Sequence, residues 1–195
     1  MARTAALLNP EARGRKALPG LLAFTDPART PDVIALARRL PPGAGLVYRA
    51  FGAQDAAETG ARLAEIARER GLVLLVGADA ALAEQIGADG VHLPERSARL
   101  AGALKARHPG WIVTTAAHSL AASRRAACSG ADATVVSAIF PSKSPSAGAP
   151  MGVVRLAVLV RQAGCPVYAL GGVNARTAAR LRGIGLAGLA GVDGF

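Results

Sequence analysis

The sequence has few cysteines, few aromatic residues and no long apolar run. Its 195 residues include two cysteines, and Phe, Trp and Tyr together make up 4%. Cys128 and Cys165 lack CxxC spacing and stand among apolar and small residues, which favours reduced, packed thiols over a catalytic thiol. No stretch reaches the roughly 18 apolar residues of a membrane helix, and the basic N-terminus has too short an apolar run for a signal peptide. We therefore expect a cytoplasmic protein with no membrane partner.

Acidic side chains are also scarce, with 13 Asp and Glu against 23 Lys and Arg, which gives a formal net charge of +10. Nearly all the cations are single arginines on the polar faces of expected helices, and no basic run is interleaved with aromatic residues. This pattern argues against a nucleic-acid partner. A positive surface instead suits a small phosphorylated molecule.

What the sequence does contain is an alternation of short apolar runs with longer Ala-, Arg- and Leu-rich segments of helical periodicity. Such alternation predicts βαβ units with a parallel sheet. Helices are expected at Pro31–Leu40, with Thr30 as the N-cap, and at Asp55–Arg70, closed by Gly71. Strands are expected near Leu21–Phe24, Gly45–Tyr48, Leu72–Val76, Gly90–Leu93, Ile112–Thr115, Ala133–Ser137, Val167–Leu170 and Leu186–Ala190.

A Gly-Ala-Asp triplet precedes two of these strands, at Gly87–Asp89 and Gly130–Asp132. We interpret each triplet as a helix end where Gly takes the left-handed conformation and Asp satisfies turn amides. Asp79 likewise marks a helix boundary. These aspartates are therefore expected to be structural.

About eight strands in one chain indicate a compact (β/α)8 TIM barrel, although such barrels typically run near 250 residues. A flavodoxin-like doubly wound sheet is the alternative, and the strand count favours the barrel. Residues 1–195 are expected to form a single domain, with 1–19 as an N-terminal extension. The sequence ends in GVDGF after the last expected strand, so the usual final helix is missing. We expect Ala5–Leu18 or the second subunit of a homodimer to cover the apolar wall there.

Residues just beyond the carboxyl ends of the strands are the functional candidates, because the sites of parallel barrels form there. The loop FPSKSPSAGAPMG, from Phe140 to Gly152, is the most informative. Ser142, Lys143 and Ser144 offer hydroxyls and a cation that suit an oxyanion, whereas a solvated linker is the alternative. The same rule selects Thr25, Asp26, Arg49, Gly77, His92, His118, Gly171–Asn174 and Gly191–Asp193.

Glycines near the last two expected strands predict a phosphate site. In LGGVN, Gly171 and Gly172 allow a phosphate to approach the backbone, and Asn174 caps the following helix. Gly191 and Val192 add backbone amides after the eighth strand, where phosphate commonly binds in such barrels.

The three histidines suggest different roles. His118 follows the fifth strand and opens a helix, so its imidazole is placed to move protons at the barrel mouth, unless it is only a surface residue near the cap. His92 either packs in the mouth or contacts a ligand. His108, beside Pro109, is expected on the surface.

In these motifs the sequence resembles the thiamine phosphate synthase/TenI family of small barrels. The stretches LLAFTD, GADGVHL, AHSL, IFPSKSPSAGAPMG and ALGGVN follow the family's motifs in order from Leu21 onward. The resemblance implies a site for a thiazole phosphate or thiamine phosphate. In the synthase branch it also implies an aminopyrimidine diphosphate with Mg²⁺, where loss of diphosphate gives a pyrimidine carbocation that the thiazole nitrogen captures. The residues it assigns to substrate binding are Arg49, His92, Ser119, Ser142, Lys143 and Ser144.

The sequence departs from the synthase pattern around the expected metal site. Gln-x-Arg-x-Lys after the second strand reads VYRAF, which keeps only Arg49. Gly77-Ala78 replace Asn-Asp, and Ser97 stands at the next acidic position, beside Glu95. Both usual Mg²⁺ carboxylates are absent from their positions, so we expect no cofactor, with Mg²⁺ bound only if synthase activity is retained.

Two further departures affect the phosphate end. Pro145 stands near the position of a second loop cation, which leaves Lys143. Asp193 replaces a small polar residue after the eighth strand, and its negative charge is expected to weaken phosphate binding.

TenI-like relatives dispense with diphosphate chemistry, and the resemblance there implies tautomerisation of a thiazole phosphate by the His of an HS motif, matched by His118 and Ser119. Our first hypothesis is such an isomerase. The second is an active synthase with a rearranged metal site that uses Glu95 or Asp26. The third is a non-catalytic ligand-binding or partner protein.

Overall fold

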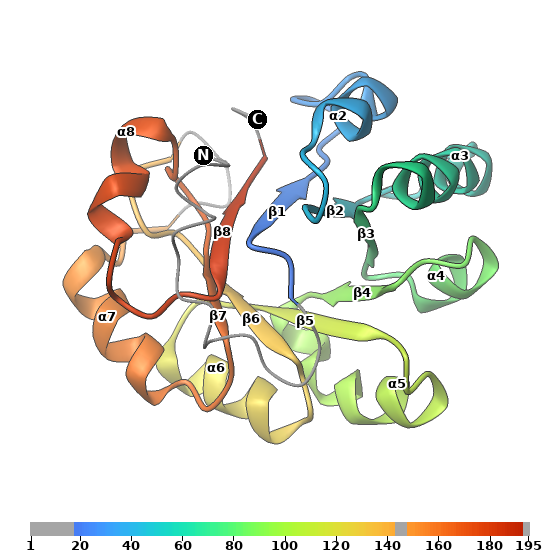
Figure 1. Ribbon diagram of the computed structural model, residues 1–195. Coiled ribbons are helices and arrows are strands. Elements are labelled where there is room, and N and C mark those ends of the chain that lie inside the picture. Colours follow the sequence, from blue (N-terminus) through green and yellow to red (C-terminus); the bar gives the residue numbers. More distant parts are fainter. Residues whose placement is uncertain (1–17, 143–147, 193–195) are drawn as a thin grey trace.

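Eight parallel strands close into a barrel in the order β1 to β8, with helices between them (Figure 1). The computed structural model describes residues 18–142 and 148–192. Each ladder joins strands that are consecutive in the chain, except that β1 pairs with β8 to close the ring. The predicted TIM barrel is thereby confirmed. The strands are β1 (Leu21–Phe24), β2 (Gly45–Tyr48), β3 (Val73–Gly77), β4 (Gly90–Leu93), β5 (Ile112–Ala117), β6 (Ala133–Val136), β7 (Val167–Ala169) and β8 (Gly188–Gly191).

Helices cover the outside of the barrel, as the crossover connections of a parallel sheet require (Figure 1). They are α2 (Val33–Arg39), α3 (Ala56–Arg70), α4 (Ala80–Gln85), the 3-10 helix η2 (Glu95–Leu100), α5 (Ala101–Arg107), α6 (Leu120–Cys128), α7 (Val153–Gln162), α8 (Ala175–Ala178) and the 3-10 helix η3 (Ala179–Leu181). Within residues 18–142 and 148–192, no helix follows β8, and residues 5–17 of the proposed covering segment lie outside this part of the chain.

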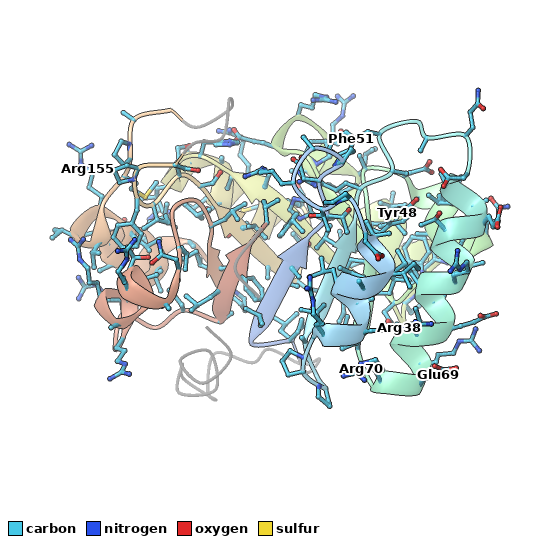
Figure 2. The ribbon with its side chains drawn as sticks, turned by 90° about the horizontal axis from the view of Figure 1, so that it is seen from above. Arg38, Tyr48, Phe51, Glu69, Arg70 and Arg155 are labelled. Atoms are coloured by element: carbon cyan, nitrogen blue, oxygen red, sulfur yellow. The ribbon has the colours of Figure 1, made fainter. Side chains whose placement is uncertain are left out.

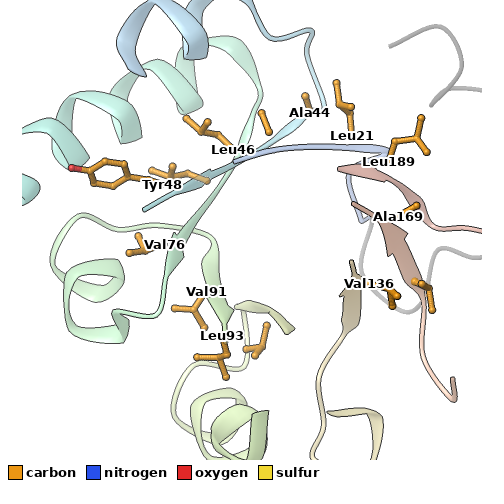
Figure 3. Close-up of a cluster of buried hydrophobic side chains, with 14 of the residues drawn as sticks. Leu21, Ala44, Leu46, Tyr48, Val76, Val91, Leu93, Val136, Ala169 and Leu189 are labelled. Atoms are coloured by element: carbon orange, nitrogen blue, oxygen red, sulfur yellow. The ribbon is translucent and has the colours of Figure 1, made fainter. Parts of the chain in front are cut away.

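The strands build two apolar layers because successive side chains point to opposite faces. In β1, Leu22 and Phe24 belong to an inner cluster that contains no helical residue, whereas Leu21 and Ala23 belong to an outer cluster shared with the helices. Figure 3 shows part of the outer cluster, including Leu46, Tyr48, Val76, Leu93 and Leu189. Strands buried on both faces explain the continuous apolar runs in the sequence.

Each Gly-Ala-Asp triplet connects the strand that follows it to the preceding strand of the barrel by a hydrogen bond. Gly87 and Gly130 have φ angles of 65° and 87°, so they take the left-handed conformation expected of them. The Asp89 carboxylate accepts a hydrogen bond from the backbone N–H of Leu74 at 2.8 Å, and Asp132 accepts one from Val113 at 2.8 Å. The amides that these aspartates satisfy therefore belong to neighbouring strands β3 and β5, and not to the turns themselves.

A tyrosine inside the barrel reaches the segment before β1. The hydroxyl of Tyr168, on β7, donates a hydrogen bond to the carbonyl oxygen of Pro19 at 2.6 Å. Leu18 is buried in the same inner cluster. This contact lies at the end of the barrel opposite the carboxyl ends of the strands.

Some local expectations need correction. The first helix begins at Val33 and is capped by Asp32 instead of Thr30. Asp32 has the extended conformation typical of an N-cap, and its carboxylate accepts from Ala35 N. The helix expected at Asp55–Arg70 is confirmed as Ala56–Arg70, closed by left-handed Gly71. Cys128 is exposed near the end of α6 instead of packed, and both cysteines are free.

None of the helices in residues 18–142 and 148–192 is long and apolar enough to cross a membrane.

Candidate functional site

Three adjoining cavities lie at the carboxyl ends of the strands. The central cavity, of about 580 Å³, shares Ser137 with a histidine cavity of about 350 Å³ that is also lined by His118 and Ser119. It shares Leu170 and Val192 with a glycine cavity of about 260 Å³. The three cavities thus adjoin one another through shared lining residues, and together they are called the mouth. The central cavity is lined by Phe24, Arg49, Ala50, Phe51, Gly52, Gly77, Ala78, Asp79, His92, Pro94, Arg96, Ala116, Ser137, Leu170 and Val192.

Arg49 is fixed on the wall of the central cavity. Its Nε donates to the carbonyl oxygen of Thr25 at 2.6 Å, and its Nη2 lies 3.3 Å from Oδ2 of Asp26. Burial is the largest single effect on the Asp26 carboxyl and opposes its ionisation. The hydrogen bonds from Arg29 and Ala28 and the charges of Arg29 and Arg49 together outweigh burial, so the pKa of Asp26 lies below its usual value. Asp26 is therefore committed to two arginines, which leaves it poorly suited to bind a metal ion.

Phe51 forms an exposed aromatic rim on the same cavity. It lies at the face of the barrel toward which the strands point (Figure 2), and 66% of its surface is exposed. The Arg49 guanidinium carbon lies 5.1 Å from the centre of its ring. Phe51 and Ala78, at φ angles of 50° and 63°, are the only non-glycine residues with positive φ in the described part of the chain. Both line the central cavity, so the backbone strain is concentrated at the mouth.

His92 faces the barrel interior directly beneath the mouth. It sits on β4 opposite Thr114 of β5, and its Nδ1 lies 3.0 Å from the Thr114 hydroxyl. Its ring meets that of Phe24 edge-on, with the ring centres 4.9 Å apart. Burial, followed by the nearby charge of Arg49, lowers the pKa of His92 to about 3. His92 is therefore a neutral, packed residue that also lines the central cavity.

His118 lies between β5 and α6 and is paired with Glu95 of η2. Its Nδ1 is 2.9 Å from Oε2 of Glu95, and its backbone N–H donates to the same oxygen at 3.0 Å. Oε1 of Glu95 lies 3.4 Å from Nη2 of Arg125, on α6. The imidazole is 58% exposed and lines the histidine cavity. This pairing gives Glu95 a different role from that of the metal ligand considered in the second hypothesis.

Ser119 acts as a helix cap. Its hydroxyl oxygen accepts from the backbone N–H of Ala122 at 3.1 Å, which begins α6 immediately after His118. The side chain also lines the histidine cavity. The cap therefore fixes the backbone that carries the imidazole.

The glycine cavity gathers the predicted phosphate-binding residues. Gly171, Gly172, Gly191 and Val192 line it together with Ser142. Gly171 and Gly172 have φ angles of 90° and 66°, and a Cβ at Gly172 would lie 2.5 Å from the carbonyl oxygen of Pro141. Their glycine identity is thus required by the backbone alone. Within residues 18–142 and 148–192, no acceptor is found for the N–H groups of this pair, which leaves both available to an anion.

The remaining predicted residues are one helix cap and four residues that the structure does not describe. Asn174 caps α8 as expected, accepting from Arg176 N and Thr177 N. Lys143, Ser144, Pro145 and Asp193 lie outside the described residues.

Sequence reasoning missed two residues of the mouth. Arg29 lines the glycine cavity as a cation, because the loop after β1 continues beyond Asp26. Phe51 is the last residue of VYRAF, where the sequence pattern marks it only as a replacement for a polar residue. In each case the signal was present, since both residues follow the carboxyl end of a strand.

The described carboxylates do not form a metal site. No group of three or more His, Cys, Asp or Glu side chains that could hold a metal ion occurs within residues 18–142 and 148–192. Asp79 is the only carboxylate that lines the central cavity in this part of the chain, and its Oδ1 already accepts from Leu82 N at 2.9 Å. Because Mg²⁺ requires several oxygen ligands, this donor set does not fit it.

Comparison with known proteins agrees with the fold and the motifs. The chain matches the model of a family described as thiamine monophosphate synthase over residues 23–195. The thiamine-phosphate synthase of Halorhodospira halophila is 35% identical over 166 residues, which cover 81% of this chain and 77% of that relative. The thiamine-phosphate synthase of Alcanivorax borkumensis is 32% identical over 180 residues, which cover 89% of this chain and 83% of that relative.

A solved structure shares the architecture. The thiamine phosphate pyrophosphorylase from Pyrococcus furiosus superposes with a TM-score of 0.77 and covers 89% of this chain and 85% of its own. Its sequence identity is 23%, so this likeness bears on the fold alone.

Proposed function

Because the chain belongs to the thiamine monophosphate synthase family, whose barrels serve thiamine biosynthesis, we propose that it binds a thiazole phosphate at the barrel mouth and isomerises it with His118. The observation that carries this proposal is the set of three adjoining cavities that make up the mouth. The glycine cavity has backbone amides that find no acceptor among residues 18–142 and 148–192, and the histidine cavity has a carboxylate-paired histidine. A site for an anion and a proton carrier on adjoining cavities are what a phosphorylated substrate of proton-transfer chemistry needs.

The phosphate group belongs in the glycine cavity. There the N–H groups of Gly171 and Gly172 and the guanidinium of Arg29 provide donors, and Gly191 and Val192 line the same cavity. Arg49 and Arg96 keep the adjoining central cavity positive. The loop residues Ser142, Lys143 and Ser144 remain further candidates for substrate contacts.

His118 supplies the chemistry at the other end. Its imidazole removes a proton from one ring carbon of the thiazole phosphate and returns a proton at another ring position, so the product is an isomer with no atom gained or lost. His92 contributes shape instead of protons, because it is buried and neutral. Ser119 holds the turn that carries His118.

Solvent exchange tests this role directly. In His118→Asn we expect thiazole phosphate to bind as in the wild type, while solvent deuterium enters the thiazole ring at least ~10²-fold more slowly, the usual scale for losing a general base. His108→Asn is the matched control, since His108 stacks on Trp111 with the ring centres 3.8 Å apart and lines none of the three cavities. Equal exchange in wild type and His118→Asn would remove His118 from the mechanism. Binding without exchange in any variant would favour a non-catalytic ligand-binding protein.

The second candidate is coupling of a thiazole phosphate to a pyrimidine diphosphate. The named relatives favour this activity more directly than isomerisation, because both are thiamine-phosphate synthases. The poor fit of the described carboxylates to Mg²⁺ weighs against it. If the chain is a synthase, its metal must therefore be held differently, with Glu95 or Asp26 recruited on substrate binding.

Product formation separates the two candidates. We expect no magnesium-dependent coupling, and no magnesium-dependent rise in thermal stability beyond that given by thiazole phosphate alone. Coupling at an ordinary enzyme rate that is lost in Glu95→Gln would establish the synthase instead. A thermal-shift panel of thiazole phosphate, thiamine phosphate and diphosphate, each with and without Mg²⁺, identifies which ligand the mouth accepts.

A further inference from the structure

The imidazole of His118 lies against the carboxylate of Glu95, and the contacts of the other two histidines are of a different kind. His92 lies beside the Thr114 hydroxyl, and Nε2 of His108 is 3.8 Å from Glu84, too far for a hydrogen bond. Nδ1 of His118 is 2.9 Å from the Glu95 carboxylate. Within residues 18–142 and 148–192, His118 is therefore the only histidine with a carboxylate oxygen at hydrogen-bonding distance.

The carboxylate of Glu95 is itself held from several sides. One oxygen contacts both the ring and the backbone N–H of His118, and the other faces Arg125 at 3.4 Å. Glu95 opens η2 directly after Pro94, whose φ angle of −64° fixes the exit of the chain from β4. η2 in turn packs against β5 and α6. The side chain thus connects two consecutive βα units of the barrel at the turn that carries the imidazole.

We propose that Glu95 is a positioning residue for His118, which keeps the ring proton on Nδ1 and leaves Nε2 as the base. An ionised carboxylate only accepts hydrogen bonds, so a neutral imidazole beside it must present Nδ1–H. Nε2 then carries the lone pair, and it has no partner among residues 18–142 and 148–192. When Nε2 takes a proton, the nearby carboxylate stabilises the resulting imidazolium. The catalytic part of this inference rests on the proposed isomerisation, whereas the tautomer does not.

Nitrogen NMR of the imidazole tests the tautomer without any substrate. In the wild-type protein at a pH where His118 is neutral, we expect one tautomer with the proton on Nδ1. In Glu95→Ala we expect exchange between the two tautomers or a shift to Nε2–H. Glu84→Ala is the matched control, because it removes the carboxylate near His108 and should leave the His118 signals unchanged. Wild-type His118 with its proton on Nε2, or the same tautomer in wild type and Glu95→Ala, would overturn the proposal.

Exchange kinetics test the consequence for catalysis. We expect Glu95→Ala to slow deuterium incorporation into the thiazole by about 10-fold or more while the Kd for thiazole phosphate is unchanged, because orientation and proton placement are lost but the phosphate contacts remain. Glu95→Gln keeps an oxygen acceptor and should recover part of the rate. It also serves as the second variant for the NMR measurement if Glu95→Ala does not fold.

The two proposals fail in different ways. Wild-type exchange that Glu95→Ala does not slow would overturn the positioning role while leaving His118 as the base. The expected tautomer in a protein that shows no exchange would support the positioning role and reject isomerisation as the function.

Discussion

Each histidine of this chain shows how its surroundings decide what an imidazole does. His92 points into the barrel from the middle of a short strand and loses access to water. His108 follows the end of α5 and stacks on Trp111. His118 lies at the mouth with a carboxylate beside it. The sequence predicted where His92 and His118 lie relative to their strands. It placed His108 on the surface, whereas the side chain of His108 is only 18% exposed. It did not predict Glu95 as the partner of His118, because the two residues are 23 positions apart and no local pattern connects them.

The buried His92 predicts a stability loss in mild acid. Its pKa is about 3 in the folded protein against 6.5 for an ordinary histidine, so the unfolded chain binds the proton more readily. The stabilisation is complete above pH 6.5 and is lost as the pH falls from 6.5 toward 3. Across this window we expect the free energy of unfolding to fall by about 1.4 kcal/mol per pH unit from this group.

Urea denaturation of wild type and His92→Gln at several pH values between about 7 and about 5 measures this effect. The wild type should lose about 2 kcal/mol more than His92→Gln over this interval, because Gln does not titrate. Parallel pH profiles for the two proteins would mean that water reaches His92 in the folded state.

At the scale of elements, apolar runs and turn residues were sufficient to place all eight strands to within about two residues. β2 and β4 have the expected bounds, since each run is flanked by clear turn residues. The predicted first helix begins at Pro31, earlier than the observed start at Val33. Thr30 and Asp32 are both good caps, and only the backbone conformation decides between them. The role of the Gly-Ala-Asp aspartates was partly predicted. Their acceptor function was expected, but a partner in the neighbouring strand depends on the tertiary fold.

These aspartates should differ in their contribution to stability. Asp132→Ala removes the acceptor for Val113 N–H and the ion pair with Lys105, and the Asp132 side chain is only 18% exposed. We expect it to lower the free energy of unfolding by about 1–3 kcal/mol, since the N–H of a fully buried residue loses its partner. Asp89→Ala should cost less because Asp89 is exposed.

Chemical denaturation of both variants gives the comparison, with Asp132→Asn as the control that keeps an oxygen acceptor. Equal losses for Asp132→Ala and Asp132→Asn would show that the charge, and not the strand amide, carries the contribution of Asp132. A larger loss in Asp89→Ala would contradict the expected order.

The whole molecule is a closed barrel. Its candidate functional groups lie at one end, and packed inner side chains close the other end. Phe51 marks the mouth, and Arg38 and Arg70 lie toward the opposite end (Figure 2). The sequence predicted this division, because residues after the strands were selected as the site. It did not predict the link between Tyr168 and Pro19, which joins positions 149 residues apart.

Removing that link tests its contribution to the closed ring. Tyr168→Phe keeps the fully buried ring but leaves the Pro19 carbonyl without its hydroxyl donor. We expect a loss of about 1–2 kcal/mol in the free energy of unfolding, with no change in thiazole phosphate binding because the contact lies away from the mouth. Reduced binding at unchanged stability would contradict this separation of the two ends.

The pairing of β1 with β8 also sets an order of events during synthesis. Seven of the ladders can form as the chain emerges, because each joins a strand to the one made just before it. The eighth pairs Leu21–Ala23 with Leu189–Gly191, so β1 waits for nearly the whole chain. Until then β1 presents an unpaired edge of the kind that recruits other strands. The newborn chain is therefore most vulnerable to aggregation just before its last strand leaves the ribosome.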